Sequence, residues 1–175
     1  MHTTFPSLVL LFGDASKFEP GPLYAISLSI HSVLRYFVLI FLIYAIVTSR
    51  KTWKSTNGLF NKKPAFFSMI TIDIMFLVGV YMWGVNFLNV TSNFENSKRL
   101  IKAPYDIRFQ LFDHPIMMTI AIILVHIGYA RSKKAASDQL KGKNIFIFYL
   151  IALIIIIVAI PWPFLHRGAS WGPSF

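Results

Sequence analysis

The chain has 175 residues, of which 55% are hydrophobic and 16% aromatic, and it carries a formal net charge of +10. Its mean hydropathy of +0.60 excludes a soluble globular domain. The positive charge is placed in the connections between apolar segments, so nucleic acid is not needed to explain it. The sequence therefore predicts one integral membrane domain that covers residues 1–175.

Four apolar segments follow one another along the chain, at about 23–49, 65–90, 115–131 and 144–165. Each approaches or exceeds the roughly 20 residues that a hydrocarbon core of about 30 Å requires of a spanning helix. Connections of moderate length favour antiparallel neighbours. We therefore expect an all-α fold, an up-down four-helix bundle in the membrane.

The basic residues fall in the first and third connections. They are Arg50, Lys51, Lys54, Lys62 and Lys63 in the first, and Arg131, Lys133, Lys134, Lys141 and Lys143 in the third. Short loops rich in Lys and Arg stay on the cytoplasmic side of a membrane. Both termini are then expected on the outer, periplasmic side of a bacterial inner membrane.

The first apolar segment contains two polar residues, His31 and Arg35. A guanidinium at membrane depth costs at least about 2.5–3.5 kcal/mol on insertion scales. We therefore expect Arg35 to face protein, water or an anionic partner rather than lipid. Because the two residues are four apart, they share one face of the helix.

The second and third segments carry further polar residues. Asp73 is a second charge inside a span, and Gly84 lies on the same face of that helix. The third segment opens with Asp113, His114 and Pro115, a pattern that predicts an N-cap followed by a proline in the first turn. His126 lies near the cytoplasmic end of that segment.

His31 and His114 are expected at the same depth. At 1.5 Å per residue, His31 lies about 28 Å from Arg50 and His114 about 25 Å from Arg131. Gly84 reaches a similar height on the second span. Two imidazoles from different helices, with a glycine opposite, suit a b-type haem, which needs two axial nitrogens and room for a flat macrocycle. We therefore predict His31 and His114 as the metal ligands.

Three other residues complete the predicted site. Arg35 is expected to pair with a haem propionate or with Asp73. Asp73 and His126 lie in the inner half of the membrane, where they could form a polar pocket for a quinone head group or a proton path. The chain has no Cys, so any metal must be held by His, Met or carboxylates.

Several short motifs carry a resemblance to a known family. They are His31-Ser32-x-x-Arg35, Asp113-His114-Pro115, His126-x-Gly128 and Ile160-Pro161-Trp162-Pro163. With these motifs the chain resembles small bacterial membrane proteins of the b-type cytochrome kind. The resemblance implies a four-helix bundle, non-covalent haem b held by His, and electron exchange with quinol or a partner redox protein. The chain differs from di-haem members because the interiors of its second and fourth spans contain no His, which argues against electron transfer between two haems. His114 and His126 are twelve residues apart and point in different directions, so one haem at most is expected.

Alternatives remain open at this stage. His31 could be a buried imidazole hydrogen-bonded to a carbonyl group, and His114 could occupy a helix N-terminus at the interface. The chain would then be a cofactor-free accessory subunit of a larger respiratory or transport complex, with its polar residues joining helices. A small transporter or copper-handling protein is a third hypothesis, but no internal repeat supports it.

Overall fold

The computed structural model describes residues 21–93 and 105–162. Both termini, whose predicted place is the periplasmic side, lie outside these ranges, as do residues 163–165 at the end of the fourth apolar segment. Within the described ranges the chain forms helices and no strands.

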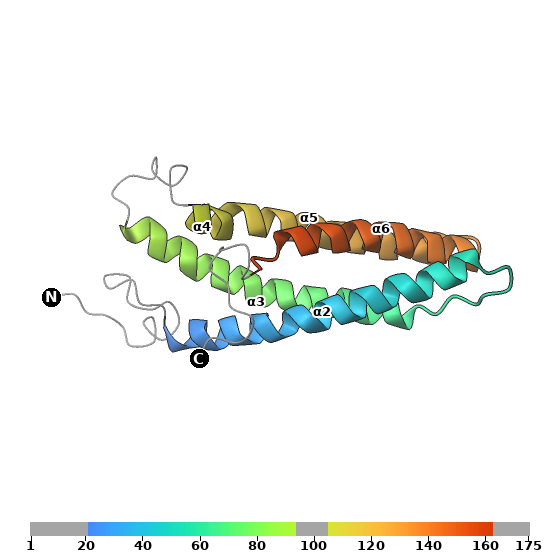
Figure 1. Cartoon of the computed structure of the whole chain (residues 1–175), viewed down its shortest axis with the longest axis horizontal. Coiled ribbons are helices and arrows are strands. Elements are labelled where there is room, and N and C mark those ends of the chain that lie inside the picture. Colours follow the sequence, from blue (N-terminus) through green and yellow to red (C-terminus); the bar gives the residue numbers. More distant parts are fainter. Residues whose placement is uncertain (1–20, 94–104, 163–175) are drawn as a thin grey trace. The chain divides into compact units, whose positions relative to one another are not determined.

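The helical elements of the described ranges follow one another along the chain, and α2 to α6 are labelled in Figure 1. They are α2 (Pro22–Lys54), α3 (Lys63–Asn93), α4 (Tyr105–Arg108), the π-helical turn η2 (Phe109–Asp113), α5 (His114–Lys134) and α6 (Asp138–Ala159). Four stretches are long and apolar enough to cross a membrane. They are Pro22–Lys54, Lys63–Asn89, Phe109–Lys134 and Asp138–Ala159. The all-α class and the four predicted apolar helices are confirmed, and they indicate a multi-pass membrane protein.

The fourth helix begins earlier than the apolar segment suggested. Ser137 lies just before α6, and its side-chain oxygen accepts a hydrogen bond from the backbone N–H of Leu140 at 3.3 Å. This N-cap satisfies one of the free N–H groups of the first helical turn. As a result Lys141 and Lys143 lie within α6, and the third connection is shorter than expected.

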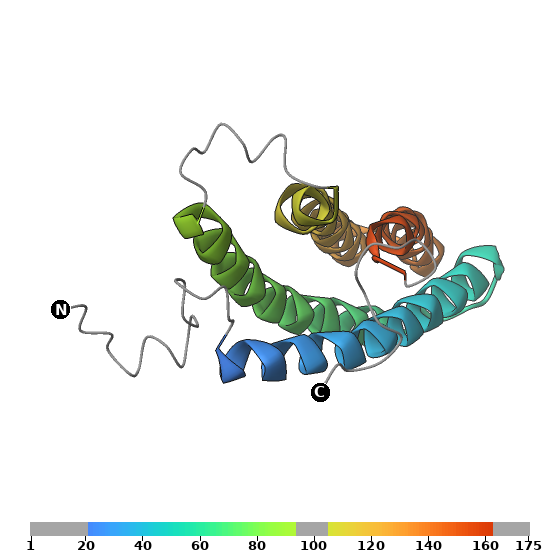
Figure 2. The same ribbon diagram turned by 60° about the vertical axis from the view of Figure 1, so that its left-hand side comes forward.

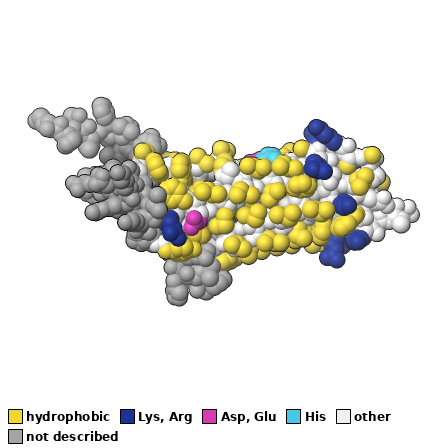
Figure 3. Space-filling model, turned by 90° about the horizontal axis from the view of Figure 1, so that it is seen from above, with side chains coloured by type: hydrophobic (Ala, Val, Ile, Leu, Met, Phe, Trp, Pro, Cys, Tyr) yellow, Lys and Arg dark blue, Asp and Glu magenta, His cyan; other side chains and the backbone are white. Residues whose placement is uncertain are grey.

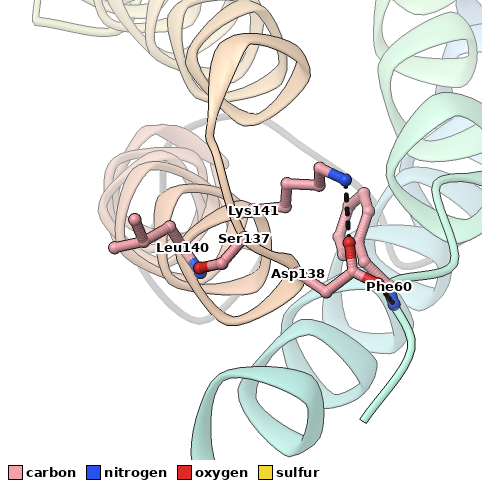
Figure 4. Close-up of polar contacts among 5 residues, drawn as sticks. All are labelled: Phe60, Ser137, Asp138, Leu140 and Lys141. Carbon is pink, nitrogen blue, oxygen red and sulfur yellow. Dashed lines mark hydrogen bonds and ion pairs between the residues drawn. The ribbon is translucent and has the colours of Figure 1, made fainter.

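Asp138 ties the start of α6 to the first connection. Its carboxylate accepts a hydrogen bond from the backbone N–H of Phe60 at 3.1 Å and forms an ion pair with Lys141 at 2.7 Å (Figure 4). The first connection is therefore joined to the first turn of α6 at this point.

The chain divides into two compact units. The described part of the first unit comprises residues 21–33, 77–93, 105–115 and 161–162. The second unit comprises residues 34–76 and 116–160.

Close backbone contacts hold the second unit together, in which α5 and α6 lie side by side (Figures 1 and 2). A Cβ atom built on Gly128 would come within 2.6 Å of the Phe148 Cβ atom. The Tyr149 hydroxyl, which is fully buried, donates a hydrogen bond to the Ala65 carbonyl oxygen at 2.9 Å. Small residues at helix contacts and buried hydrogen bonds between helices are the usual means of packing in a membrane.

The surface of the second unit is largely apolar. Figure 3 shows hydrophobic side chains over much of the described part of the visible face. The exposed apolar residues of α2 in this unit include Phe37, Ile40, Ile43 and Val47. An exposed apolar surface of this kind suits contact with lipid.

Candidate functional site

The first unit brings His31 and His114 together, from α2 and from the start of α5. Their ring centroids are 6.3 Å apart, with an angle of 68° between the ring planes. Both side chains are half-buried. The two histidines predicted to meet are thus neighbours in space although 83 positions separate them in the chain (114 − 31).

A π-helical turn positions His114. The backbone N–H of His114 donates to the Phe109 carbonyl oxygen, five residues earlier. The Phe109 ring is buried and lies 6.1 Å from the His114 ring. The indole N–H of Trp83 on α3 donates to the Leu111 carbonyl oxygen at 2.9 Å and so holds the turn. Single π-helical turns inside α-helices occur frequently at functional sites.

The predicted N-cap at Asp113 is wrong. Helical structure already begins at Tyr105 and continues through Asp113 into α5, so this residue lies inside a helical stretch rather than before one. Its side chain therefore cannot cap the start of the span.

The glycine beside His31 is Gly79. A Cβ atom built on Gly79 would lie 3.4 Å from His31 Cε1, whereas one built on Gly84 would meet no atom within 4 Å. The residue count from the Lys- and Arg-rich ends of the spans predicts that Gly84 lies at the same depth in the membrane as His31 and His114. Gly79 lies about 7 Å away along the same helix, at 1.5 Å per residue.

The distance between the two imidazole rings can be compared with the distance expected at a metal site. Two imidazole nitrogens that each lie about 2 Å from one first-row metal ion would bring their ring centroids within roughly 6 Å of each other. The spacing of 6.3 Å between His31 and His114 agrees with this value. Two axial imidazoles are also the ligand set of many b-type haems. The same spacing is also that of an ordinary edge-to-face contact between two rings.

No larger ligand cluster competes with this pair in the part of the chain that the structure describes. No group of three or more His, Cys, Asp or Glu side chains is arranged there to hold a metal ion.

Arg35 lies in the second unit and is only 8% exposed. One of its Nη atoms donates to the hydroxyl oxygen of Tyr36 at 3.1 Å, and its Cζ atom lies 4.9 Å from the centre of that ring. The guanidinium group is therefore largely covered by protein, and its position relative to lipid stays a prediction.

Asp73 and His126 also meet, in the second unit. His126 Nε2 lies 2.9 Å from a carboxylate oxygen of Asp73, with side-chain exposures of 47% and 39%. The ion-pair partner of Asp73 is therefore His126, on α5. Asp73 and His126, which were predicted to act together, are therefore in contact. The contact lies at the surface of this unit.

Comparison with protein-family models, with curated proteins and with solved structures gives no match to this chain.

Proposed function

We propose that this chain is a b-type cytochrome-like membrane subunit that takes part in electron transfer and exchanges electrons with quinol. One haem b would be held by His31 and His114, in a bacterial inner membrane. The observation that supports this proposal is the 6.3 Å spacing of the two imidazoles, which come from separate helices.

The surrounding residues suit this role. A bound haem supplies a one-electron couple whose potential depends on its axial ligands and on nearby charge. Phe109 packs against His114 and fixes the orientation of that ring, while Gly79 leaves room beside His31. Arg35 belongs to the second unit, so its pairing with a haem propionate stays a prediction from the sequence.

The Asp73–His126 pair would bind the head group of the quinol. A carboxylate accepts hydrogen bonds, and an imidazole can donate or accept them, so the pair offers both kinds of contact to a hydroxyl or carbonyl group of the ring. Its partial exposure leaves it accessible to a ligand that arrives from the bilayer.

Haem content of purified variants tests the ligand assignment. The purified full chain should contain about one haem per chain by pyridine assay, and His31→Ala or His114→Ala should remove nearly all of it, because one axial imidazole holds a b-type haem poorly. His126→Ala is the matched control, since it removes a histidine outside the ligand pair, and it should keep the haem. Equal haem loss in all three variants, or none in any, would contradict the assignment.

A cofactor-free accessory subunit is the second candidate. The exposed Asp73–His126 pair favours it, because a polar pair on an apolar helix surface can join a helix of another subunit. A stable complex that co-purifies without haem, and that assembles unchanged with His31→Ala, would support this candidate. If Asp73→Asn abolishes that complex and His31→Ala does not, the Asp73–His126 pair is the contact with the other subunit.

A further inference from the structure

Two aromatic rings meet where α2 ends and α6 begins. Trp53 and Phe146 have ring centroids 5.4 Å apart, with 40° between their planes. The helix backbones are close here, because a Cβ atom built on Gly142 would lie 2.7 Å from the Ser49 carbonyl oxygen and 3.0 Å from the Trp53 nitrogen. This close approach fixes both rings in the second unit.

Three cations surround these rings. The Nζ atom of Lys54 lies 4.5 Å from the Trp53 ring centre, and that of Lys143 lies 5.9 Å from it. The Cζ atom of Arg50 lies 5.9 Å from the Phe146 ring centre. We call these five residues the Trp53 cluster.

The charges of the Trp53 cluster are not neutralised by carboxylates within the described part of the chain. The ion pairs described there join His126 to Asp73 and Lys141 to Asp138, and none involves a cation of the cluster. Contact with an aromatic face stabilises each cation but leaves the mutual repulsion of the three in place. An anion placed among them would remove that repulsion.

We propose that the Trp53 cluster binds the phosphate group of an anionic phospholipid. The cluster lies at the end of two candidate membrane spans, the level at which Trp side chains meet lipid head groups. Lys54, Lys143 and Arg50 donate hydrogen bonds to the phosphate oxygens, and the two rings form the base of the site.

The helix surface next to the cluster favours a lipid over a free phosphate ion. Ile43, Val47, Arg50 and Lys54 recur every three or four residues and so share one face of α2. Ile43 and Val47 are 48% and 45% exposed. A strip of exposed apolar side chains therefore continues from the basic cluster into the span, where an acyl chain can lie.

Native mass spectrometry of the detergent-solubilised full chain tests this proposal, with phosphatidylglycerol and phosphatidylcholine as probes. Phosphatidylglycerol should bind more tightly. Lys54→Gln combined with Lys143→Gln should weaken its binding about 25-fold, since each lysine near an anionic lipid contributes about 1 kcal/mol, or about fivefold. Lys62→Gln combined with Lys63→Gln removes the same charge outside the cluster and should change binding less than about threefold.

Three results would overturn the proposal. They are equal binding of the two lipids, equal weakening by both double variants, and complete displacement of phosphatidylglycerol by inorganic phosphate. The last result would identify a site for free anions. None of these outcomes depends on haem, so this test and that of the proposed function can fail separately.

Discussion

At the scale of single residues, the room beside His31 depends on the absence of a side chain at Gly79. The Cβ atom of an alanine there would make ordinary contact with His31 Cε1 at 3.4 Å, while a larger side chain would occupy the space next to the imidazole. Gly79→Leu should therefore lower haem per chain about tenfold, whereas Gly79→Ala should retain most of it. The pyridine assay on the two purified variants checks this, and similar haem content in both would show that the space beside His31 is not used.

The charged and ionisable site residues could be found in the sequence because each is out of place in an apolar helix. Arg35, Asp73 and His126 all require a partner at membrane depth, and the structure gives each one. Gly79 could not be found in this way, because a glycine in a spanning helix carries no such penalty. Which of Gly79 and Gly84 lies beside His31 depends on how far α2 and α3 are shifted along their axes relative to each other.

At the scale of helices, the packing of α5 on α6 depends on Gly128. Gly128→Ala would place a Cβ atom 2.6 Å from the Phe148 Cβ atom, which lies next to the backbone and cannot move away easily. We expect a loss of about 1–3 kcal/mol of stability. Gly84→Ala makes the same chemical change where a Cβ atom meets open space, and it should be neutral or stabilising by up to about 1 kcal/mol.

Thermal unfolding of the two variants in detergent compares these effects. The midpoint should fall for Gly128→Ala and hold or rise for Gly84→Ala. Equal midpoints would mean that α5 and α6 do not approach each other closely at Gly128.

Helix positions followed from the apolar pattern, whereas helix ends did not. The hydrophobic segments located all four spans because the bilayer fixes their length. The start of α6 depends on one hydrogen bond from Leu140 to Ser137, and the turn before His114 depends on a five-residue backbone bond to Phe109. Local contacts of this kind are not visible in hydropathy.

At the scale of the whole molecule, the basic connections predict the orientation in the membrane. Because the chain has no native Cys, single cysteines can be introduced without background. Thr56→Cys and Ala136→Cys place exposed thiols in the first and third connections. Both should react with an impermeant maleimide only in inverted membrane vesicles, since Lys- and Arg-rich loops stay cytoplasmic. Labelling of the two sites from opposite faces would contradict the up-down arrangement.

The central claim is that His31 and His114 hold one haem between them. The most direct test is the reduced-minus-oxidised absorption spectrum of the purified full chain. The account predicts the sharp α-band of a low-spin b-type haem with two imidazole ligands, and its disappearance in His114→Ala. A colourless wild-type protein, prepared with haem supplied during expression, would contradict the claim.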